Sequence, residues 1–273
     1  MDRDSTRQLI QNLKDFADRN ASAEVFSEED FAATFGQITP FVRTFPIHFE
    51  TFECLRSRAM PYATDLENVK QMGPPPEHRV RGLSRCNHEG QSILYGASNL
   101  PTSFLELGLS ESHSCAITTQ FRLRDGEALT LIAIGELDHY RRHKRPRLGT
   151  PGIAEQIDAL INPLEAYDQI AHYFVDSYLA DLFSRPADSQ RNVYEVTARI
   201  ANAFLQIEEI DGIIYPSVRH EGGLNYALRS EVFGKLDVVK FSLTCTASDC
   251  LDTLLHLRPP FAWHKPDGLQ GVT

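Results

Sequence analysis

Long apolar runs are missing from this chain of 273 residues, and its N-terminus lacks the apolar leader of a secreted protein. The longest strongly apolar run, Ala128 to Ile134, is far shorter than the ~20 residues that cross a bilayer. Charged residues begin at the second position, which excludes the apolar core of a signal peptide. The sequence therefore predicts a soluble cytoplasmic protein without a membrane partner.

Cysteine pairs are also scarce. The five cysteines are an odd number, which fits a reducing compartment better than a disulfide framework. Cys245, Cys250 and His256 form the one cluster that resembles metal ligands, but no second pair stands at zinc-site spacing. Spare thiols are expected here, and no metal site is predicted.

The chain also has fewer positively charged residues, 27 Lys and Arg, than negatively charged ones, 37 Asp and Glu. A net charge of −10 argues against a general nucleic-acid binder, because such binding needs a positive field. A local exception is the basic run 141–147, which could contact RNA, an acidic partner or the phosphates of a dinucleotide. A solvated loop is the simpler interpretation of that run. No GxGxxG or Walker sequence follows a strand, so NAD held as a Rossmann cofactor is not expected.

What is present indicates a globular α+β protein. Hydrophobic residues make up 42% of the chain and charged residues 23%, which are ordinary values for a soluble domain with a substantial core. Periodicity predicts a helical N-terminal extension, then strands, a helical middle and strands again. Strands are predicted at 49–59, 93–97, 117–123, 128–134, 212–217, 226–229 and 236–243, and helices at 5–19, 102–109, 150–160, 162–183 and 189–207, with a short helix opening at Ser27.

Three details of this pattern are specific. Ser27 and Asp30 form a capping-box pattern at the start of the short helix, and Pro40 and Pro46 are expected to mark the exit from the helical extension. The segments 117–123 and 128–134 are expected to form a hairpin across Asp125-Gly126. The domain limits predicted from this pattern are a helical extension at 1–45, a main domain at 46–250 and a C-terminal tail at 251–273.

One stretch stands out for its chemistry. Arg85, Tyr95 and Glu106 are spaced across a turn, a short strand and a helix, in the sequence RCNHEGQSILYGASNLPTSFLE. A cation, an aromatic hydroxyl and a carboxylate can together hold a phosphorylated sugar and stabilise positive charge on it. A distant stretch, GIIYPSVRHEGGLN at 212–225, is suited to complete such a pocket.

These motifs resemble those of the RES domain family. The matching runs are Arg85-x-Asn87, then Gly90, then Leu-Tyr95-x-Ala, then a helix bearing Glu106. Further matches are LRSRA at 55–59 before a Gly-Pro-Pro-Pro loop, and Tyr-Pro-Ser-Val-Arg at 215–219 with Gly222 and Asn225 behind it.

The resemblance covers roughly residues 50 to 245 and implies a fold similar to diphtheria-toxin-like ADP-ribosyltransferases, with a mixed or antiparallel β core and flanking helices. It also implies cleavage of NAD, which would be a substrate and not a resident cofactor, and a toxin neutralised by an Xre-type antitoxin. The chain is longer than the compact toxins of the family, and it carries Gly96 where many members have a larger residue. The partner and its regulation are left open by these departures.

The resemblance implies catalytic roles for Glu106, Arg85 and Tyr95. Breaking the nicotinamide–ribose bond creates an oxocarbenium-like centre, which the carboxylate of Glu106 would stabilise. Arg85 could pair with a pyrophosphate in bidentate fashion, and Tyr95 could stack on nicotinamide or donate to a phosphate. Each residue also has a plain interpretation, respectively a helix-surface acid, a loop arginine and a core tyrosine.

Substrate-binding roles fall to Arg56, Asn87, Ser217 and Asn225. Arg56 and Arg58 stand two apart on one strand, so spacing alone does not choose between them, and the family's opening strand favours Arg56. Ser217 could bind the nicotinamide amide or a phosphate, and no partner at a recognisable spacing makes it a nucleophile.

The function predicted from these residues is NAD degradation, by phosphorolysis or hydrolysis of the N-glycosidic bond, with inorganic phosphate as a possible co-substrate. One alternative is a protein ADP-ribosyltransferase. Another is an inactive binding module that docks through the basic run 141–147. The oligomeric state cannot be read from the sequence.

Overall fold

Strands from both halves of the chain combine in one sheet. The computed structural model describes residues 1–21, 27–43, 45–59, 72–108, 115–186 and 193–245. The strands are β1 (Pro46–Phe49), β2 (Glu53–Ala59), β3 (Ile93–Ala97), β4 (Cys115–Leu123), β5 (Leu129–Ala133), β6 (Gly212–Pro216), β7 (Leu224–Arg229) and β8 (Leu236–Cys245). Their order in the sheet is β1-β5-β6-β7-β3-β2-β4-β8, and each neighbouring pair is antiparallel except β5 and β6.

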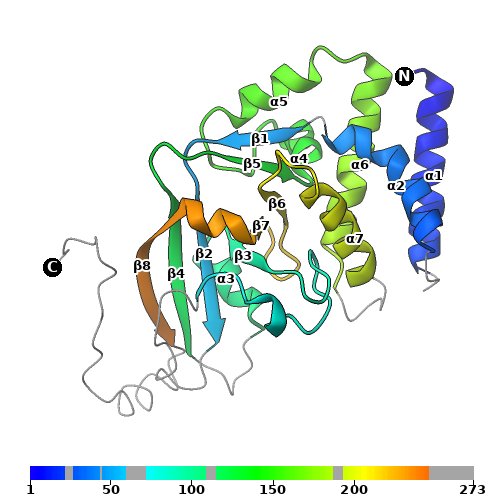
Figure 1. Cartoon of the computed structure of the whole chain (residues 1–273). Helices are drawn as coiled ribbons and strands as arrows, with labels where there is room; N and C mark the ends of the chain where they lie inside the picture. Colours follow the sequence, from blue (N-terminus) through cyan, green and yellow to red (C-terminus); the bar gives the residue numbers. More distant parts are fainter. Residues whose placement is uncertain (22–26, 44, 60–71, 109–114, 187–192, 246–273) are drawn as a thin grey trace, which may run out of the picture.

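Helices flank this sheet, which confirms the predicted α+β class. They are α1 (Arg3–Ala21), α2 (Glu28–Arg43), α3 (Leu100–Glu106), α4 (Glu136–His143), α5 (Ile153–Ile161), α6 (Ala166–Phe183) and α7 (Val193–Leu205), with short 3₁₀ helices η2 (Glu77–Arg79) and η4 (Ser230–Lys235). The helices α1, α2, α6 and α7 gather at one side of the molecule, away from β4 and β8 (Figure 1).

The central strands are buried on both faces. Ile213 and Tyr215 of β6 belong to a core shared with α1, α2, α6 and α7, whereas Ile214 belongs to a second core with α5 and β1. On β7, Ala227 faces the first core and Leu228 the second. Because successive side chains of a strand point to opposite faces, β6 and β7 are buried along nearly their whole length and form the middle of the protein, with Asn225 of β7 as a buried polar residue.

The N-terminal helices share the first of these cores. Phe16 of α1 packs edge-on against Tyr178 of α6 at 6.1 Å between ring centroids, and Phe35 of α2 lies 5.4 Å from Phe204 of α7. The Ser27 hydroxyl accepts a hydrogen bond from the Asp30 amide, so the predicted N-terminal cap of α2 is confirmed.

Two sequence-based expectations were wrong. Pro40 does not mark the exit from the helical extension, because it lies inside α2, which continues to Arg43, whereas Pro46 begins β1 as expected. Val42, beyond the proline, is buried in the shared core, and this packing outweighs the backbone hydrogen bond that proline cannot donate. The hairpin across Asp125-Gly126 does not form either, because β4 pairs with β2 and β8 while β5 pairs with β1 and β6.

The bounds of the strands near the N-terminus are close to the predicted ones. β3 has the predicted bounds, and β1 is a separate strand just before the predicted strand at 49–59, of which β2 forms the larger part. The predicted tail at 251–273 lies outside the described residues, and the division at residue 45 stays a prediction. In the described part of the chain, no helix combines the length and apolar character that a bilayer crossing requires.

Candidate active site

The candidate site lies where two neighbouring strands separate. β2 and β3 share a single pair of opposed residues, Leu55 and Ala97, whereas β2 pairs with β4 along its whole length. A cavity of about 560 Å³ opens there, within the range of ligand pockets. Its lining consists of Leu55, Arg56, Ser57, Ser84, Arg85, Tyr95, Gly96, Ala97, Ser103, Glu106, Leu107, Pro186, Tyr194, Tyr215, Val218, Arg219 and Asn225.

Glu106 is the last residue of α3 and the only acid in this lining. Its Oε1 atom accepts hydrogen bonds from the Ser217 hydroxyl at 2.6 Å and from the Asn225 amide at 2.7 Å. Among the described residues, Oε2 has no hydrogen-bond partner. The carboxylate is thus exposed but fixed, with one oxygen held by the protein and the other available to a ligand.

Ser217 and Asn225 act on Glu106 from two different strands. Ser217 follows β6, and its Oγ atom also accepts from the backbone amides of Arg219 and His220 at 3.2 and 3.1 Å. Its proton goes to Glu106, so the geometry is that of a serine that orients a carboxylate and not that of a nucleophile. Asn225, on β7, is buried and lines the cavity, whereas Ser217 does not line it directly.

Local sequence explains how α3 reaches this position. Asn99 caps the helix by accepting a hydrogen bond from the Thr102 amide, and Pro101 stands in the first turn. The Thr102 hydroxyl in turn lies 2.7 Å from Nδ1 of His220. The start of α3 is therefore tied to the loop behind β6 that carries Ser217.

Arg85 is buried, with 8% of its surface exposed, and lies on the cavity wall. Its Nη2 atom donates to the carbonyl oxygen of Arg185 at 2.8 Å, and its guanidinium lies 5.3 Å from the centre of the Tyr194 ring. Its Nη1 atom is buried without a hydrogen-bond partner in the described part of the structure. Since leaving a buried donor unpaired costs free energy, this atom is placed to meet a ligand acceptor.

Arg56 lines the opposite side of the cavity, and Arg58 does not line it. Arg56 donates from Nη1 to the carbonyl oxygen of Tyr95 at 3.1 Å, and its Nε atom is buried without a partner within the described ranges. Burial, and then the nearby Arg58 cation, lower the pKa of Arg56 to about 10, so the guanidinium stays charged at neutral pH. Of the two arginines on β2, the structure thus brings Arg56 to the site.

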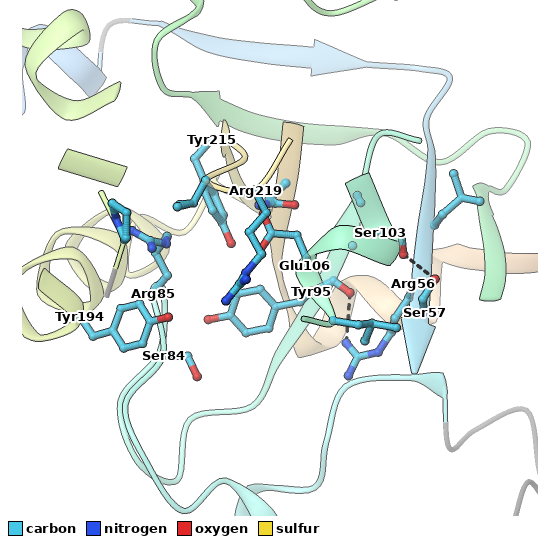
Figure 2. Close-up of a pocket in the computed structure, with 17 residues that line it drawn as sticks. Arg56, Ser57, Ser84, Arg85, Tyr95, Ser103, Glu106, Tyr194, Tyr215 and Arg219 are labelled. Carbon is cyan, nitrogen blue, oxygen red and sulfur yellow. Dashed lines mark hydrogen bonds between the residues drawn. The ribbon is translucent and has the colours of Figure 1, made fainter. Parts of the chain in front are cut away.

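Tyr95 lies between the two arginines (Figure 2). Its hydroxyl donates to Oδ1 of Asn87 at 2.8 Å and accepts from the Cys86 amide at 3.0 Å. Burial raises the pKa of Tyr95 well above its usual value, so the phenol stays neutral. Its proton is used inside the protein, and the ring is the part available for contact with a ligand.

Asn87 is buried and does not line the cavity. Besides the Tyr95 hydroxyl, its hydrogen bonds run to carbonyl groups of its own loop, those of Gly82 and His88. The structure therefore places Asn87 behind Tyr95, as a residue that fixes the ring, and not in direct reach of a ligand.

Three aromatic or cationic lining residues were missed in the sequence. Tyr194 comes from α7, and Tyr215 from β6, where burial raises its pKa well above the usual value. Tyr215 and Arg219 were quoted only as parts of one motif, yet the guanidinium of Arg219 extends toward the centre of the cavity beside Tyr95 (Figure 2). In the sequence, the position of Arg219 two residues after Ser217 was the one sign of a role in the site, and no sign marked Tyr194.

The charge of the lining is opposite to that of the chain. Three guanidinium groups, on Arg56, Arg85 and Arg219, face a single carboxylate in a protein of net charge −10. None of the three is in an ion pair within the described parts of the chain. Arg85 is buried, Arg56 half-buried and Arg219 exposed, and three such cations without acidic partners favour an anionic ligand with more than one charge, such as a pyrophosphate.

The basic run 141–147 is a different kind of feature. It begins inside α4, where Asp138 accepts from both Arg141 and Arg142 at 2.7 Å. The backbone amide of Arg147 donates to Glu136. Two of the run's cations are thus paired with Asp138 within α4, and none of the residues of the run lines the cavity.

Over the described ranges, no three His, Cys, Asp or Glu side chains are grouped to hold a metal ion. Cys250 and His256, the residues grouped with Cys245 in the sequence, lie outside those ranges.

Comparison with known proteins identifies the family. The sequence model of the RES domain matches residues 63–248, about two thirds of the chain. The chain belongs to the RES domain family, as the motifs around Arg85 and Ser217 indicated, and this membership implies an enzyme of toxin type that acts on NAD. No curated protein matches the chain.

Proposed function

We propose that this protein degrades NAD by cleaving the bond between nicotinamide and ribose, with phosphate or water as the acceptor. The observation that carries this proposal is the fixed carboxylate of Glu106 in a cavity lined by three arginines. A dinucleotide has the charge that the arginines favour, and a glycosidic bond is the chemistry that a lone carboxylate can assist.

In the proposed reaction, the arginines hold the anionic dinucleotide and the ring of Tyr95 packs against the nicotinamide side. As the glycosidic bond breaks, its electron pair leaves with nicotinamide and positive charge develops on the ribose. The carboxylate of Glu106 stabilises that charge, because Ser217 and Asn225 hold it in place before the reaction begins. The acceptor then adds to the ribose, giving ADP-ribose from water or ADP-ribose 1″-phosphate from phosphate.

The proposal includes a biological role. The protein would act as a toxin in the cytoplasm by depleting NAD, under control of an Xre-type antitoxin. The support for this role is family membership. A protein ADP-ribosyltransferase remains the rival within enzymes, whereas internal pairing of the basic run in α4 gives no support to a binding module built on it.

The test is to incubate the purified protein with NAD, with and without inorganic phosphate, and to resolve the products by mass. We expect free nicotinamide in both cases if water is an acceptor, and a phosphate-dependent product if phosphate is. Incorporation of ADP-ribose into added protein would establish the transferase instead. Failure to release nicotinamide under any condition would reject the proposed chemistry.

A second test addresses the toxin role. Expression in bacteria should arrest growth, and the Glu106→Ala variant, expressed to the same level, should relieve that arrest. Arrest that persists with the variant would mean that toxicity does not arise from the proposed site.

A further inference from the structure

The helical block between β5 and β6 contributes to the wall of the cavity. Arg85 stands in the loop before β3, but the groups that contact its guanidinium come from this block. Arg185 follows α6 and accepts from Nη2 through its carbonyl oxygen, while Tyr194 is the second residue of α7. Pro186, beside Arg185, also lines the cavity. The block is therefore part of the site and not only a layer that covers the sheet.

The contact between Tyr194 and Arg85 has a defined geometry. The guanidinium lies 5.3 Å from the ring centre, within the distance at which a cation and an aromatic ring attract each other. Because a guanidinium donates hydrogen bonds in its own plane, a ring beside it limits its motion while leaving in-plane N–H groups available. Nη2 is used by the Arg185 carbonyl, and the buried Nη1 is the donor that remains.

Other donors surround that position. The hydroxyls of Tyr194 and Ser84 have no hydrogen-bond partner in the described residues, and both residues line the cavity. Figure 2 shows both, together with Arg85, on the side of Tyr95 that is remote from Arg56. An acceptor with several oxygens and more than one negative charge would satisfy such a group of donors.

We infer that Tyr194 is a positioning residue for Arg85, and that Arg85, Tyr194 and Ser84 together form the subsite for the pyrophosphate of the substrate. The inference rests on the proposed function, since a dinucleotide is the substrate that supplies this group. It assigns part of substrate recognition to α7, which carries none of the residues by which the family was identified from the sequence.

The test measures binding and turnover separately. Calorimetric titration with ADP reports on the pyrophosphate subsite without any reaction. We expect Tyr194→Leu to weaken ADP binding by about 3- to 30-fold, the range of a cation–aromatic contact in a partly desolvated site. Tyr194→Phe keeps the ring and loses only the hydroxyl donor, so we expect it to weaken ADP binding less than Tyr194→Leu does, and the difference between the two variants is the contribution of the ring.

Turnover of NAD gives the second reading. For a residue that positions a binding group, Tyr194→Leu should raise KM by about the same factor and change kcat by less than about 3-fold. Circular dichroism and thermal unfolding verify that both variants fold. Unchanged ADP affinity in Tyr194→Leu, an equal loss in Tyr194→Phe, or a fall in kcat without a rise in KM would overturn the inference.

The two proposals can fail independently. If the wild type binds ADP with the expected sensitivity to Tyr194 but releases no nicotinamide from NAD, the subsite stands and the proposed reaction falls. If NAD is cleaved while ADP does not bind, the reaction stands and the subsite assignment falls.

Discussion

At the scale of a single residue, the side chain of Glu106 is exposed to solvent and is nevertheless held in one orientation by hydrogen bonds. A helix-surface glutamate would have a free side chain, but the two hydrogen bonds that Glu106 accepts from Ser217 and Asn225 both fall on Oε1 and come from residues more than a hundred positions away. Charged acceptors make the stronger hydrogen bonds, so the carboxylate is oriented before a substrate arrives.

Glu106→Gln is the sharpest test of this residue. The amide oxygen can still accept from Ser217 and Asn225, so the loop should keep its shape while the negative charge is lost. We expect the rate of nicotinamide release to fall at least ~10²-fold, the size of one transition-state contact. Glu89→Gln, an exposed residue outside the cavity, is the control and should match the wild type. A Glu106→Gln enzyme with near wild-type turnover would remove Glu106 from the mechanism.

The sequence was most informative about residues within motifs. Arg85, Tyr95, Glu106 and Asn225 all line one cavity, although they are spread over 141 positions from Arg85 to Asn225. Their types suggested a shared chemistry, which is why they could be grouped without a structure. Asn87 and Ser217 were grouped with them, but they hold Tyr95 and Glu106 instead of lining the cavity. Whether a polar residue contacts a ligand or another residue depends on tertiary distances that spacing does not contain.

At the scale of elements, the loop behind β6 and the helix α3 behave as one unit. Gly223 packs so closely against this junction that a Cβ atom there would overlap the Thr102 hydroxyl and lie 2.8 Å from Nδ1 of His220. These two groups form the hydrogen bond that joins the loop to the start of α3. Since α3 ends at Glu106, a shift at its start is transmitted to the carboxylate.

Gly223→Ala should therefore lower activity without touching a lining residue. Overpacking of this kind costs about 1–3 kcal/mol, and the strain should appear as displacement of α3. We expect a loss of NAD turnover of about tenfold or more, with a lower midpoint of thermal unfolding. Gly82→Ala is the matched control, because a Cβ atom there meets nothing within 4 Å. Equal activity of the two variants would show that the junction tolerates the added methyl group.

The order of the strands in the sheet is a feature that local sequence patterns do not predict. β4 and β5 are adjacent in the chain and alternate in hydrophobicity, so a hairpin was the local expectation. In the sheet they lie far apart, because β4 is paired along its length with β2 and β8. Long-range strand pairing depends on the whole set of available edges, and a two-residue turn signal does not record it. Gly96 is a contrasting case, since a Cβ atom there would come within 3.1 Å of the Cys54 thiol, which accounts for the small residue at this position.

At the scale of the whole molecule, the N-terminal helices are part of the core although the family match begins at residue 63. Leu13, Phe16, Phe31 and Phe35 are all buried in the cluster that includes α6 and α7. Arg185, two residues after the end of α6, and Tyr194 of α7 are the residues that hold Arg85. The extension therefore supports the wall of the cavity indirectly, through α6 and α7.

Removal of residues 1–45 should leave a chain that does not unfold cooperatively, because it exposes the apolar face of α6 and α7. The point variant Phe16→Ala should lower the free energy of unfolding by about 3–5 kcal/mol, as is typical for a buried phenylalanine. Lys14→Ala on the same helix is exposed and should change it by less than about 0.5 kcal/mol. Urea unfolding followed by circular dichroism measures all three, and a truncated chain of full stability would show that the extension is a separate unit.

The buried Asp176 should make the stability of the whole protein depend on pH. This carboxylate of α6 accepts from the Gly135 amide at 2.7 Å and the Asp138 amide at 2.9 Å, and so holds the start of α4. Burial raises its pKa from 3.8 to about 7, despite these two hydrogen bonds. The nearby Glu136 carboxyl, whose own pKa is raised by burial, and Asp138, which pairs with Arg141 and Arg142, face the same region.

The direction of the pH effect follows from the proton balance. Between pH 4 and 7 the folded protein retains a proton on Asp176 that the unfolded chain has lost, so stability falls as the pH rises through this window. We expect the advantage of the wild type over Asp176→Asn, measured as the free energy of unfolding in urea, to shrink from pH 5 to pH 8. The change should be on the order of 2 kcal/mol, since one bound proton contributes about 1.4 kcal/mol per pH unit. A difference between the two proteins that stays constant over this range would mean that Asp176 is ionised in the folded state throughout, and that its two amide donors outweigh its burial.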